Sequence, residues 1–581
     1  MKYMRLGTRP DTFYTGEATR MINSDLPSDL TIRIDNITYL LHKFPLLPKS
    51  GLMQQRCSER GETGGFTVDL HDIPGGSDAF ELCAKFCYGI KIDLSAHNIV
   101  SAICAAKFLL MTESVREGNF ISKLEVFFDS CILEGWKDSV VALETTERHS
   151  EWSENLGIIR RCIDSVVDKI LTPASKVCWT YTYTRPGYAH RKHHKSAPKD
   201  WWTEDIADMN IDIFRCIIIT LRSTNMLPPQ LIGEALHVYA CRWLPGVTKS
   251  RPDPETSTAS QMTKEESVNR IKQLEIIVSL IPEDKGSVSV GFLIRLLSIA
   301  KFLGASPVIR THLIKKCSLQ LEEAKIDDLM LPLHESSSDN PIYDIELVEA
   351  VLEGFVTQWR KLYSIDEQSL HLIIKVGRLV DSYLQIISTD ANMSVQKVMS
   401  LAKTLPEFAR PEHDKLYKAI NIYLNEHPQM SKDDKKRLCS ILDCQKLSDE
   451  ACAHAIRNDK LPLRTVVQIL FFEQEKHSGK ALSSRERQKI QLQPQRTKPR
   501  ETTRDSQKIL QQSSKADDAI RRSGQGSTSQ MLEPESESEQ KSREQEVRKT
   551  RSYEAMEEER KQEHTNITIQ RSKSERRRSG K

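Results

Sequence analysis

The sequence predicts a small α+β module at the amino end, a mainly α-helical domain after it, and a disordered, charged carboxy-terminal tail. Three observations support this division. Apolar and polar residues alternate between residues 30 and 70, which is typical of half-buried strands. Between residues 120 and 472, apolar residues recur at helical spacing instead. From about residue 478 onward this periodicity is lost, and Ser, Gln, Lys, Arg and Glu dominate.

The composition favours an intracellular protein with more than one domain. A chain of 581 residues can form two or three domains with sizeable cores. Its formal net charge of +3 is small for this length, so we expect no nucleic-acid partner. We find no apolar run of about 18 residues, the length that a transmembrane helix needs, and the first residues lack the apolar core of a secretory signal. The thirteen scattered cysteines are typical of reduced thiols in the cytosol or nucleus.

The α+β module is predicted over residues 28–118, after a polar, flexible amino terminus at residues 1–27. Asp35 and Asn36 supply a turn between two strands, a third strand follows, and Gly89 ends the first long helix. Strands and helices in this order form an α+β unit of about 100 residues. The inward-facing positions are Leu30, Ile32, Ile34, Ile37, Tyr39, Leu41, Phe66, Val68 and Leu70 in the strands, and Phe80, Cys83, Phe86 and Cys87 in the helix.

Helical periodicity defines the next parts of the chain. Residues 119–171 form a helical extension of the module, and residues 172–199, which contain proline and a charge run, form a linker. The helical domain covers residues 200–476, with a flexible insertion rich in Ser, Thr and Pro at residues 245–266. A helical bundle and an irregular solenoid remain alternatives, because no fixed repeat period is present. Residues 477–581 are predicted to be disordered, since they have too little apolar surface to offset their ordering entropy.

Two stretches inside the helical domain allow a more detailed prediction. Thr203 is a suitable N-cap for a helix whose inward stripe runs from Ile206 to Leu221. The stretch KLYKAINIYLNEHP, residues 415–428, is predicted to be an amphipathic helix that ends at Pro428, because proline lacks an N–H and disfavours the helical conformation of the preceding residue. Four of its apolar residues share one face of that helix: Leu416, Ile420, Tyr423 and Leu424.

The predicted α+β module resembles the BTB domain, also called POZ, in its plant form. The resemblance is carried by the segments SDLTIRI, HKFPLLPKSG and FCYGIKIDL. It implies a protein-interaction module that self-associates as a homo- or heterodimer and often docks a cullin 3-type scaffold. Because many such domains only dimerise, the fold by itself does not establish cullin binding.

The helical domain resembles the plant non-phototropic hypocotyl 3 family. Matching segments occur in the family's order, at WWTEDI (201–206), residues 275–303, GRLVDSYL (377–384) and the amphipathic helix described above. The resemblance implies that Tyr423 is a candidate phosphorylation site. Periodicity instead favours a packed tyrosine with its hydroxyl at the rim, which must be exposed before a kinase can reach it. The signature positions are Trp201, Trp202, Leu416, Tyr417, Ile420, Tyr423, Leu424 and Pro428.

The last eleven residues, RSKSERRRSGK, form a basic cluster that contains serines. Basic residues precede Ser574 and Ser579, so both are candidate phosphorylation sites. The terminal R-x-S element around Ser579 resembles the one through which family relatives bind 14-3-3 proteins. The same cluster can bind anionic lipid head groups, and phosphorylation would weaken that attraction. A solvated basic end and a nuclear address remain alternatives.

We expect a non-catalytic protein without metal or cofactor. The chain lacks a P-loop, a dinucleotide fingerprint and the common hydrolase motifs. His190, His193 and His194 lie together in a basic loop without cysteine partners, which disfavours a zinc site. The resemblances imply a substrate adaptor of a cullin 3-type ubiquitin ligase in phototropism or auxin-type signalling. The alternative is a scaffold at the plasma membrane for a phototropin-type kinase, without ubiquitin transfer. The expected location is cytoplasmic, with peripheral attachment to the inner face of the plasma membrane, or the nucleus, as further alternatives.

Overall fold

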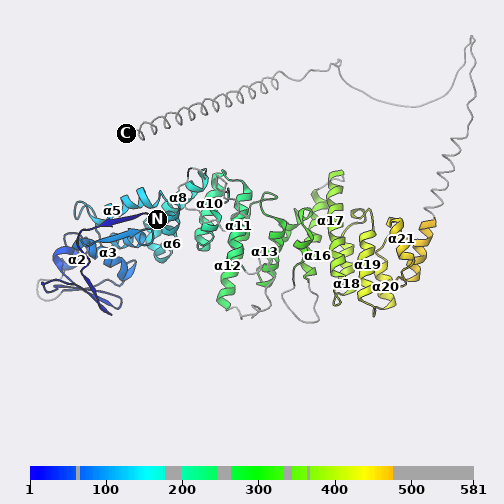
Figure 1. The fold of residues 1–581 in the computed structure, drawn as a ribbon, viewed down its shortest axis with the longest axis horizontal. Coiled ribbons are helices and arrows are strands. Elements are labelled where there is room, and N and C mark those ends of the chain that lie inside the picture. The colour runs from blue at the N-terminus through cyan, green and yellow to red at the C-terminus, as the bar shows by residue number, and fades with distance from the viewer. Residues whose placement is uncertain are drawn as a thin grey trace, which may run out of the picture. The chain divides into compact units, whose positions relative to one another are not determined.

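The computed structural model (Figure 1) describes residues 1–59, 66–173, 176, 198–244, 263–332, 343–362 and 367–474. All of these belong to one compact unit, Met1–Gln493. The predictions of a disordered tail at residues 477–581, of most of the linker at 172–199 and of most of the insertion at 245–266 fall outside the described residues.

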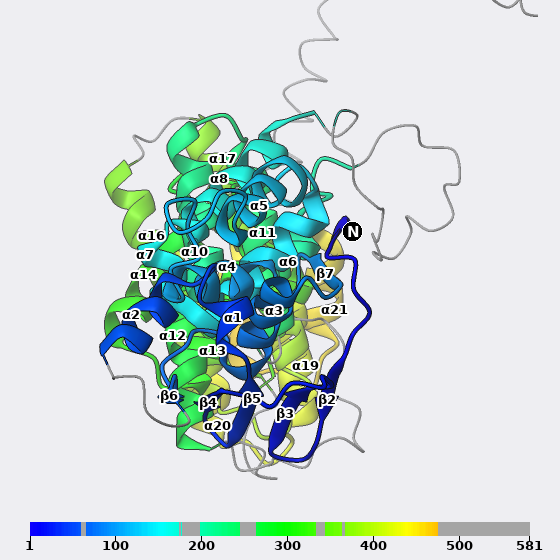
Figure 2. The ribbon, with the colours of Figure 1, turned by 90° about the vertical axis from the view of Figure 1, so that its left-hand side faces the viewer.

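The amino-terminal part is built on a mixed five-stranded sheet with the order β2-β3-β5-β4-β6, which Figure 2 shows side by side. β4 and β5 form the predicted hairpin, with Leu30 opposite Leu41. Asp35 in its turn has a φ of 49°, a left-handed conformation that aspartate tolerates. β1 and β7 form a separate antiparallel pair. The strands are β1 Tyr3–Leu6, β2 Phe13–Thr15, β3 Thr19–Ile22, β4 Leu30–Ile34, β5 Ile37–Leu41, β6 Phe66–Asp69 and β7 Ile92–Ser95.

Helices α1 to α4 pack with the strands to form the core of the amino-terminal part. Tyr39 of β5 packs edge-to-face on Phe80 of α3, with ring centroids 4.9 Å apart, and the Tyr39 hydroxyl donates to the Ser77 carbonyl oxygen at 3.0 Å. α3 ends at Tyr88, and Gly89 is its C-cap with a φ of 72°, as predicted. α4 is apolar on nearly every side and is buried, as expected of a central helix. The helices are α1 Lys43–Leu46, α2 Gly51–Glu59, α3 Gly76–Tyr88 and α4 Ile99–Phe108.

The prediction of a flexible segment at residues 1–27 is wrong. This segment contains β1, β2 and β3, and β3 pairs in parallel with β5. Residues 13–22 therefore belong to the same sheet as β4, β5 and β6, and a boundary at residue 28 would cut that sheet. These strands have only three or four residues each, and β1 finds its partner about 90 residues away, so local alternation gives little signal for them.

The remaining described chain is almost entirely helical. α5 to α8 follow the sheet, after which the helices of the carboxy-terminal part succeed one another in chain order (Figure 1). Their bounds are α5 Phe120–Phe127, α6 Trp136–Thr145, α7 Ser150–Asn155, α8 Ile158–Leu171, α9 Thr203–Ile206, α10 Ile211–Thr224, α11 Pro229–Trp243, α12 Lys264–Leu280, α13 Val290–Phe302, α14 Pro307–Ser318, α15 Ile326–Leu329, α16 Ile345–Leu362, α17 Glu367–Ile387, α18 Val395–Thr404, α19 Asp414–Glu426, α20 Lys432–Cys439 and α21 Asp449–Ile456.

Helices that are close in sequence pack together. α13 contacts α14, α14 contacts α16, α16 contacts α18, and α17 contacts α19. Of the two alternatives left open by the sequence, this pattern fits an irregular solenoid, in which each element contacts its near neighbours.

Two predicted helix boundaries are wrong. Thr203 does not cap a long helix, because α9 is a single turn and the Thr203 hydroxyl donates to the Asp200 carbonyl oxygen at 2.9 Å. The long helix is α10, whose N-cap Asn210 accepts a hydrogen bond from the Asp212 backbone at 2.8 Å. The end of the predicted insertion also differs: Thr263 forms a capping box with Glu266, so residues 264–266 belong to α12.

Candidate functional site

The signature helix α19 lies in the core of the carboxy-terminal part. Its predicted apolar face is buried, and it packs on α17 and α20. The helix ends at Glu426, two residues before Pro428, as predicted. Lys415, Lys418 and Asn425 are exposed on the other side. The buried signature positions in this helix are Leu416, Tyr417, Ile420, Tyr423 and Leu424.

Tyr423 is packed as predicted, but its hydroxyl is not at the rim. Only 2% of the residue is exposed, and the buried hydroxyl donates to the Met393 carbonyl oxygen at 2.6 Å. Burial raises the pKa of the Tyr423 phenol to about 12, so it stays protonated and remains a donor. Its ring stacks on His427, with centroids 3.8 Å apart. The candidate phosphorylation site is therefore closed in this conformation.

A small cleft opens beside Tyr423. It has a volume of about 400 Å³ and lies between the end of α19, the start of α20 and the residues before α18. Tyr423, His427, Glu426 and Asp434 contribute to its wall. Tyr423 therefore borders this cleft although the residue is almost fully buried.

Tyr417 joins α19 to α21. Its hydroxyl lies 2.6 Å from His454 Nδ1, and the side-chain amide of Asn458 donates to the same hydroxyl at 3.4 Å. Asn458 also donates to Asn421 at 2.8 Å. These hydrogen bonds thus fix the position of α21 and of the residues that follow it relative to α19.

A buried ion pair joins α17 to the segment that precedes α19. Arg410 Nε donates to the Asp381 carboxylate at 2.7 Å, and Arg410 Nη1 donates to the Ala402 carbonyl oxygen at 2.7 Å. Both side chains are almost fully buried. Burial raises the pKa of the Asp381 carboxyl, and the guanidinium works against that rise. The Ala409 carbonyl oxygen lies so close to Gly377 that a Cβ atom at residue 377 would collide with it. In the tract GRLVDSYL, the glycine therefore allows a close backbone approach, and the aspartate forms a buried ion pair.

His413, just before α19, is a buried neutral histidine. Its Nδ1 accepts a hydrogen bond from the Asp443 backbone N–H at 3.0 Å, and its own backbone N–H donates to the Lys446 carbonyl oxygen at 3.0 Å. Burial, together with the nearby Lys446 and Arg410 cations, lowers the pKa of His413 to about 4. An uncharged imidazole thus fixes the loop that follows α20.

The first signature segment joins two parts of the chain. Trp201 and Trp202 are buried, and Trp201 packs edge-to-face on Trp136 of α6, with centroids 4.6 Å apart. Trp136 Nε1 donates to the Asp205 carboxylate at 2.6 Å. Burial is the main cause of the raised pKa of Asp205. These residues therefore connect the helical extension to the helical domain.

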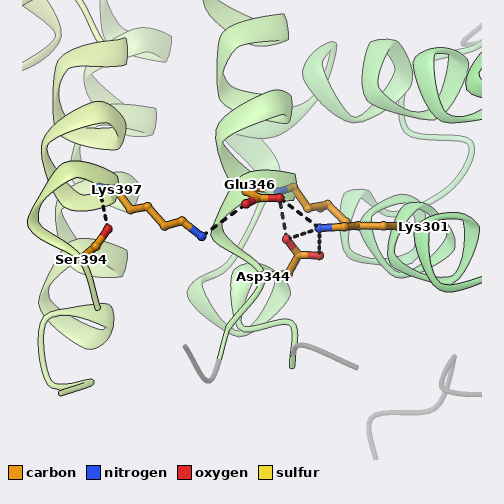
Figure 3. A network of polar contacts seen from close by, with 6 residues as sticks. Lys301, Asp344, Glu346, Ser394 and Lys397 are labelled. Carbon is orange, nitrogen blue, oxygen red and sulfur yellow. Dashed lines mark hydrogen bonds and ion pairs between the residues drawn. The ribbon is translucent and has the colours of Figure 1, made fainter. Parts of the chain in front are cut away.

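An ion network braces three helices in the middle of the domain (Figure 3). Lys301 of α13 donates to both carboxylate oxygens of Asp344, at 2.9 and 2.8 Å. Asp344 also accepts from the Leu347 backbone at 3.2 Å and so caps α16. Glu346 lies 3.7 Å from Lys301 and 3.3 Å from Lys397 of α18. Hydrogen bonding and charge from Lys397 and Lys301 lower the pKa of Glu346.

Apart from the exposed Pro428, the signature residues are thus core residues rather than a binding surface. Arg410, Asp381 and His413 complete the arrangement and were missed by sequence analysis. The only available signal was that Asp381 falls four residues after Gly377 and three before the buried Leu384, on one helix face. Surfaces that can bind partners must be sought elsewhere.

One such surface is on the amino-terminal part. Phe44 of α1 is 86% exposed and Leu26 is 71% exposed. His42, two residues before Phe44, lies with its Nε2 atom 3.1 Å from the Leu26 carbonyl oxygen. Exposed aromatic side chains are frequent anchors of protein interfaces.

Several sequence-based expectations fall outside the described residues. These are Ser574, Ser579 and the histidine cluster at His190, His193 and His194. In the described part of the chain, no three His, Cys, Asp or Glu side chains are placed to hold a metal ion. Among the described helices, none is both long and apolar enough to span a membrane.

Comparison with known proteins gives consistent matches. The family model described as the NPH3 family matches residues 200–452. A BTB/POZ domain-containing protein of Arabidopsis thaliana is 56% identical over 496 residues, which cover 84% of this chain and 88% of that protein. The phototropic-responsive NPH3 family protein NPY1 of the same plant is 39% identical, covering 82% of each chain. Its root phototropism protein 3 is 33% identical, covering 81% of this chain and 77% of that protein. No solved structure matches.

Proposed function

Because this chain belongs to the NPH3 family, we propose that it is a non-catalytic substrate adaptor of a cullin 3-type ubiquitin ligase in plant phototropic or auxin-type signalling. An adaptor performs no chemistry and acts by raising the effective concentration of a client near the ligase. The observation that carries the proposal is the combination, in one chain, of a sheet-and-helix module that exposes Phe44 with a helical region whose signature residues, apart from Pro428, are core.

We assign the amino-terminal module as a BTB/POZ domain that dimerises and docks the cullin. The names of relatives support this assignment, and so does a compact mixed sheet covered by helices. In our proposal the domain comprises residues 28–118 together with the strands found in residues 1–27. Residues 119–171 extend it, and residues 172–199 link it to the helical domain at 200–476.

The helical domain would hold the client. Its signature residues fix the core, which leaves the exposed helix faces and grooves for recognition. Phosphorylation would regulate the assembly: at Ser579 or Ser574 it would create an anionic site for a 14-3-3 protein, and at Tyr423 it would require local opening of α19. A phototropin-type kinase is the proposed enzyme for the serines.

The alternative function is a plasma-membrane scaffold for such a kinase without ubiquitin transfer. The basic residues of the carboxy-terminal RSKSERRRSGK segment favour it, because clustered cations bind anionic lipid surfaces. We place the protein in the cytoplasm, with peripheral attachment to the inner face of the plasma membrane, or the nucleus, as further alternatives.

Binding of the full chain to the purified amino-terminal domain of cullin 3 tests the proposal. We expect a dimer by light scattering and a dissociation constant in the micromolar range or tighter. Phe44→Asp should weaken binding at least tenfold without unfolding the protein, because the side chain is 86% exposed. Val308→Asp is the matched control, since Val308 is 77% exposed on α14. A folded dimer without detectable cullin binding would overturn the adaptor proposal and leave the scaffold.

A further inference from the structure

A groove of about 690 Å³ lies between the helical extension and the helical domain. One wall comes from the turn at Thr146–His149, α7 and α8, and the other from α10 and its N-cap. The apolar part of the lining comes from Ile159 and Ile163 of α8 and from Ile213 and Cys216 of α10. None of these residues belongs to the signature or to the exposed surface around Phe44.

The rim of the groove is acidic. Four carboxylates line it, Glu147, Glu154, Asp164 and Asp212, against the single guanidinium of Arg160. Glu147 is held in place by Asn210 on the opposite wall, whose side-chain amide donates to it at 2.9 Å.

The charges of this rim remain accessible to a partner. Arg160 lies 3.7 Å from Asp164, and Lys272 lies 2.9 Å from Asp212, but all four side chains are more than half exposed. Such pairs are weak and exchange readily. The groove therefore keeps an excess of negative charge beside its apolar lining residues.

We propose that this groove is the docking site for a basic amphipathic helix of a protein partner. Apolar side chains on one face of such a helix would contact Ile159, Ile163 and Ile213, while flanking Lys or Arg side chains would meet the acidic rim. Charge complementarity selects this occupant, because an acidic segment would be repelled by the same carboxylates. The inference rests on the proposed function only in that the partner would be the adaptor's client.

A synthetic amphipathic peptide built of leucine, alanine and lysine tests the proposal, with the leucines at helical spacing. Its affinity for the full-length protein is measured by fluorescence anisotropy at low and high salt. We expect saturable binding that weakens with salt, and at least tenfold weaker binding of the same peptide with glutamate in place of lysine. Equal binding of the two peptides would overturn the proposal.

Two variants on one helix locate the site. Glu154→Lys should weaken binding of the lysine peptide about tenfold. Glu151→Lys, on an exposed residue of α7 outside the groove lining, should leave it unchanged. Equal effects of the two changes would refute the groove as the site.

Thiol chemistry gives an independent readout. Cys216 is exposed and lines the groove, whereas Cys131 is half-buried and lies outside the groove lining. Bound peptide should slow alkylation of Cys216 but not of Cys131, and unchanged alkylation of Cys216 would contradict docking there.

A change in the mass of the protein on Glu154→Lys, measured by light scattering, would mean that a second copy occupies the groove, which also overturns the proposal. Because no cullin is present in these assays, they can fail while the adaptor proposal stands.

Discussion

The buried hydroxyl of Tyr423 is a stabilising group in its own right. It donates to the Met393 carbonyl oxygen at 2.6 Å, and this hydrogen bond is buried. Tyr423→Phe removes the donor and leaves the acceptor buried, so we expect the protein to lose about 1–2 kcal/mol of unfolding free energy. Urea denaturation followed by circular dichroism measures this loss. Tyr14→Phe is the control, because Tyr14 is 63% exposed, and equal stability of both variants would show that the bond contributes nothing.

His413 makes stability depend on pH. Its folded pKa of about 4 lies below the ordinary value of 6.5, so the unfolded chain binds a proton at a pH where the folded chain does not. The contribution of His413 is therefore fully present above pH 6.5 and is lost as the pH falls toward 4. Between pH 7 and pH 5 the loss should be about 2 kcal/mol.

The variant His413→Asn isolates this effect. Its side-chain oxygen can still accept the Asp443 backbone N–H but does not titrate. Urea midpoints at pH 7 and pH 5 should fall less in the variant than in the natural protein. The same fall in both proteins would rule out His413 as the titrating group.

The apolar signature residues were predictable, whereas the buried ion pair of Arg410 and Asp381 was not. Leu416, Ile420 and Leu424 repeat at helical spacing, and that pattern alone places them inside. Arg410 and Asp381 carry no such pattern, because an isolated charge in a polar stretch is normally at the surface. Their burial depends on each other across 29 residues, which only the folded chain reveals.

At the scale of elements, the ion network of Figure 3 contains one buried carboxylate and one exposed carboxylate. Asp344 is 7% exposed in its side chain, whereas Glu346 is 66% exposed. Asp344→Asn leaves Lys301 facing a neutral group and should destabilise the protein by about 1–3 kcal/mol. Glu346→Gln should change stability by less than about 1 kcal/mol, because its partners are screened by water. Thermal denaturation at low and high salt compares the two, and a larger effect at Glu346 would contradict this ranking.

The helices of the carboxy-terminal part were largely predictable, but their starts were not. The stripe from Ile206 to Leu221 is buried as predicted apart from the half-buried Ile213, yet it spans a single turn, a break and α10. Thr203 and Asn210 are both acceptable N-caps, so local chemistry cannot choose between them. The amino-terminal strands were missed for a different reason, since pairing between β1 and β7 is a long-range contact.

At the scale of the whole molecule, composition gives a misleading picture of how the chain divides into domains. The linker composition at residues 172–199 suggests independent halves. However, Trp201 packs on Trp136, Asp205 accepts from Trp136, and α8 contacts α10 across this division. Aromatic contacts of this kind contribute about 0.5–1.5 kcal/mol beyond the area they bury. The extension and the helical domain should therefore behave as one body.

Cleavage of the chain tests that expectation. A protease site introduced within residues 177–197 allows the chain to be cut after folding. We expect the two fragments to elute together from a sizing column, because the contacts of Trp136 with Trp201 and Asp205 do not require the intervening peptide. Trp201→Ala should let the cut fragments separate. Trp243→Ala should not, since that ring contacts Tyr239 within its own fragment. Separation of the natural fragments would show instead that the linker alone holds the two parts together.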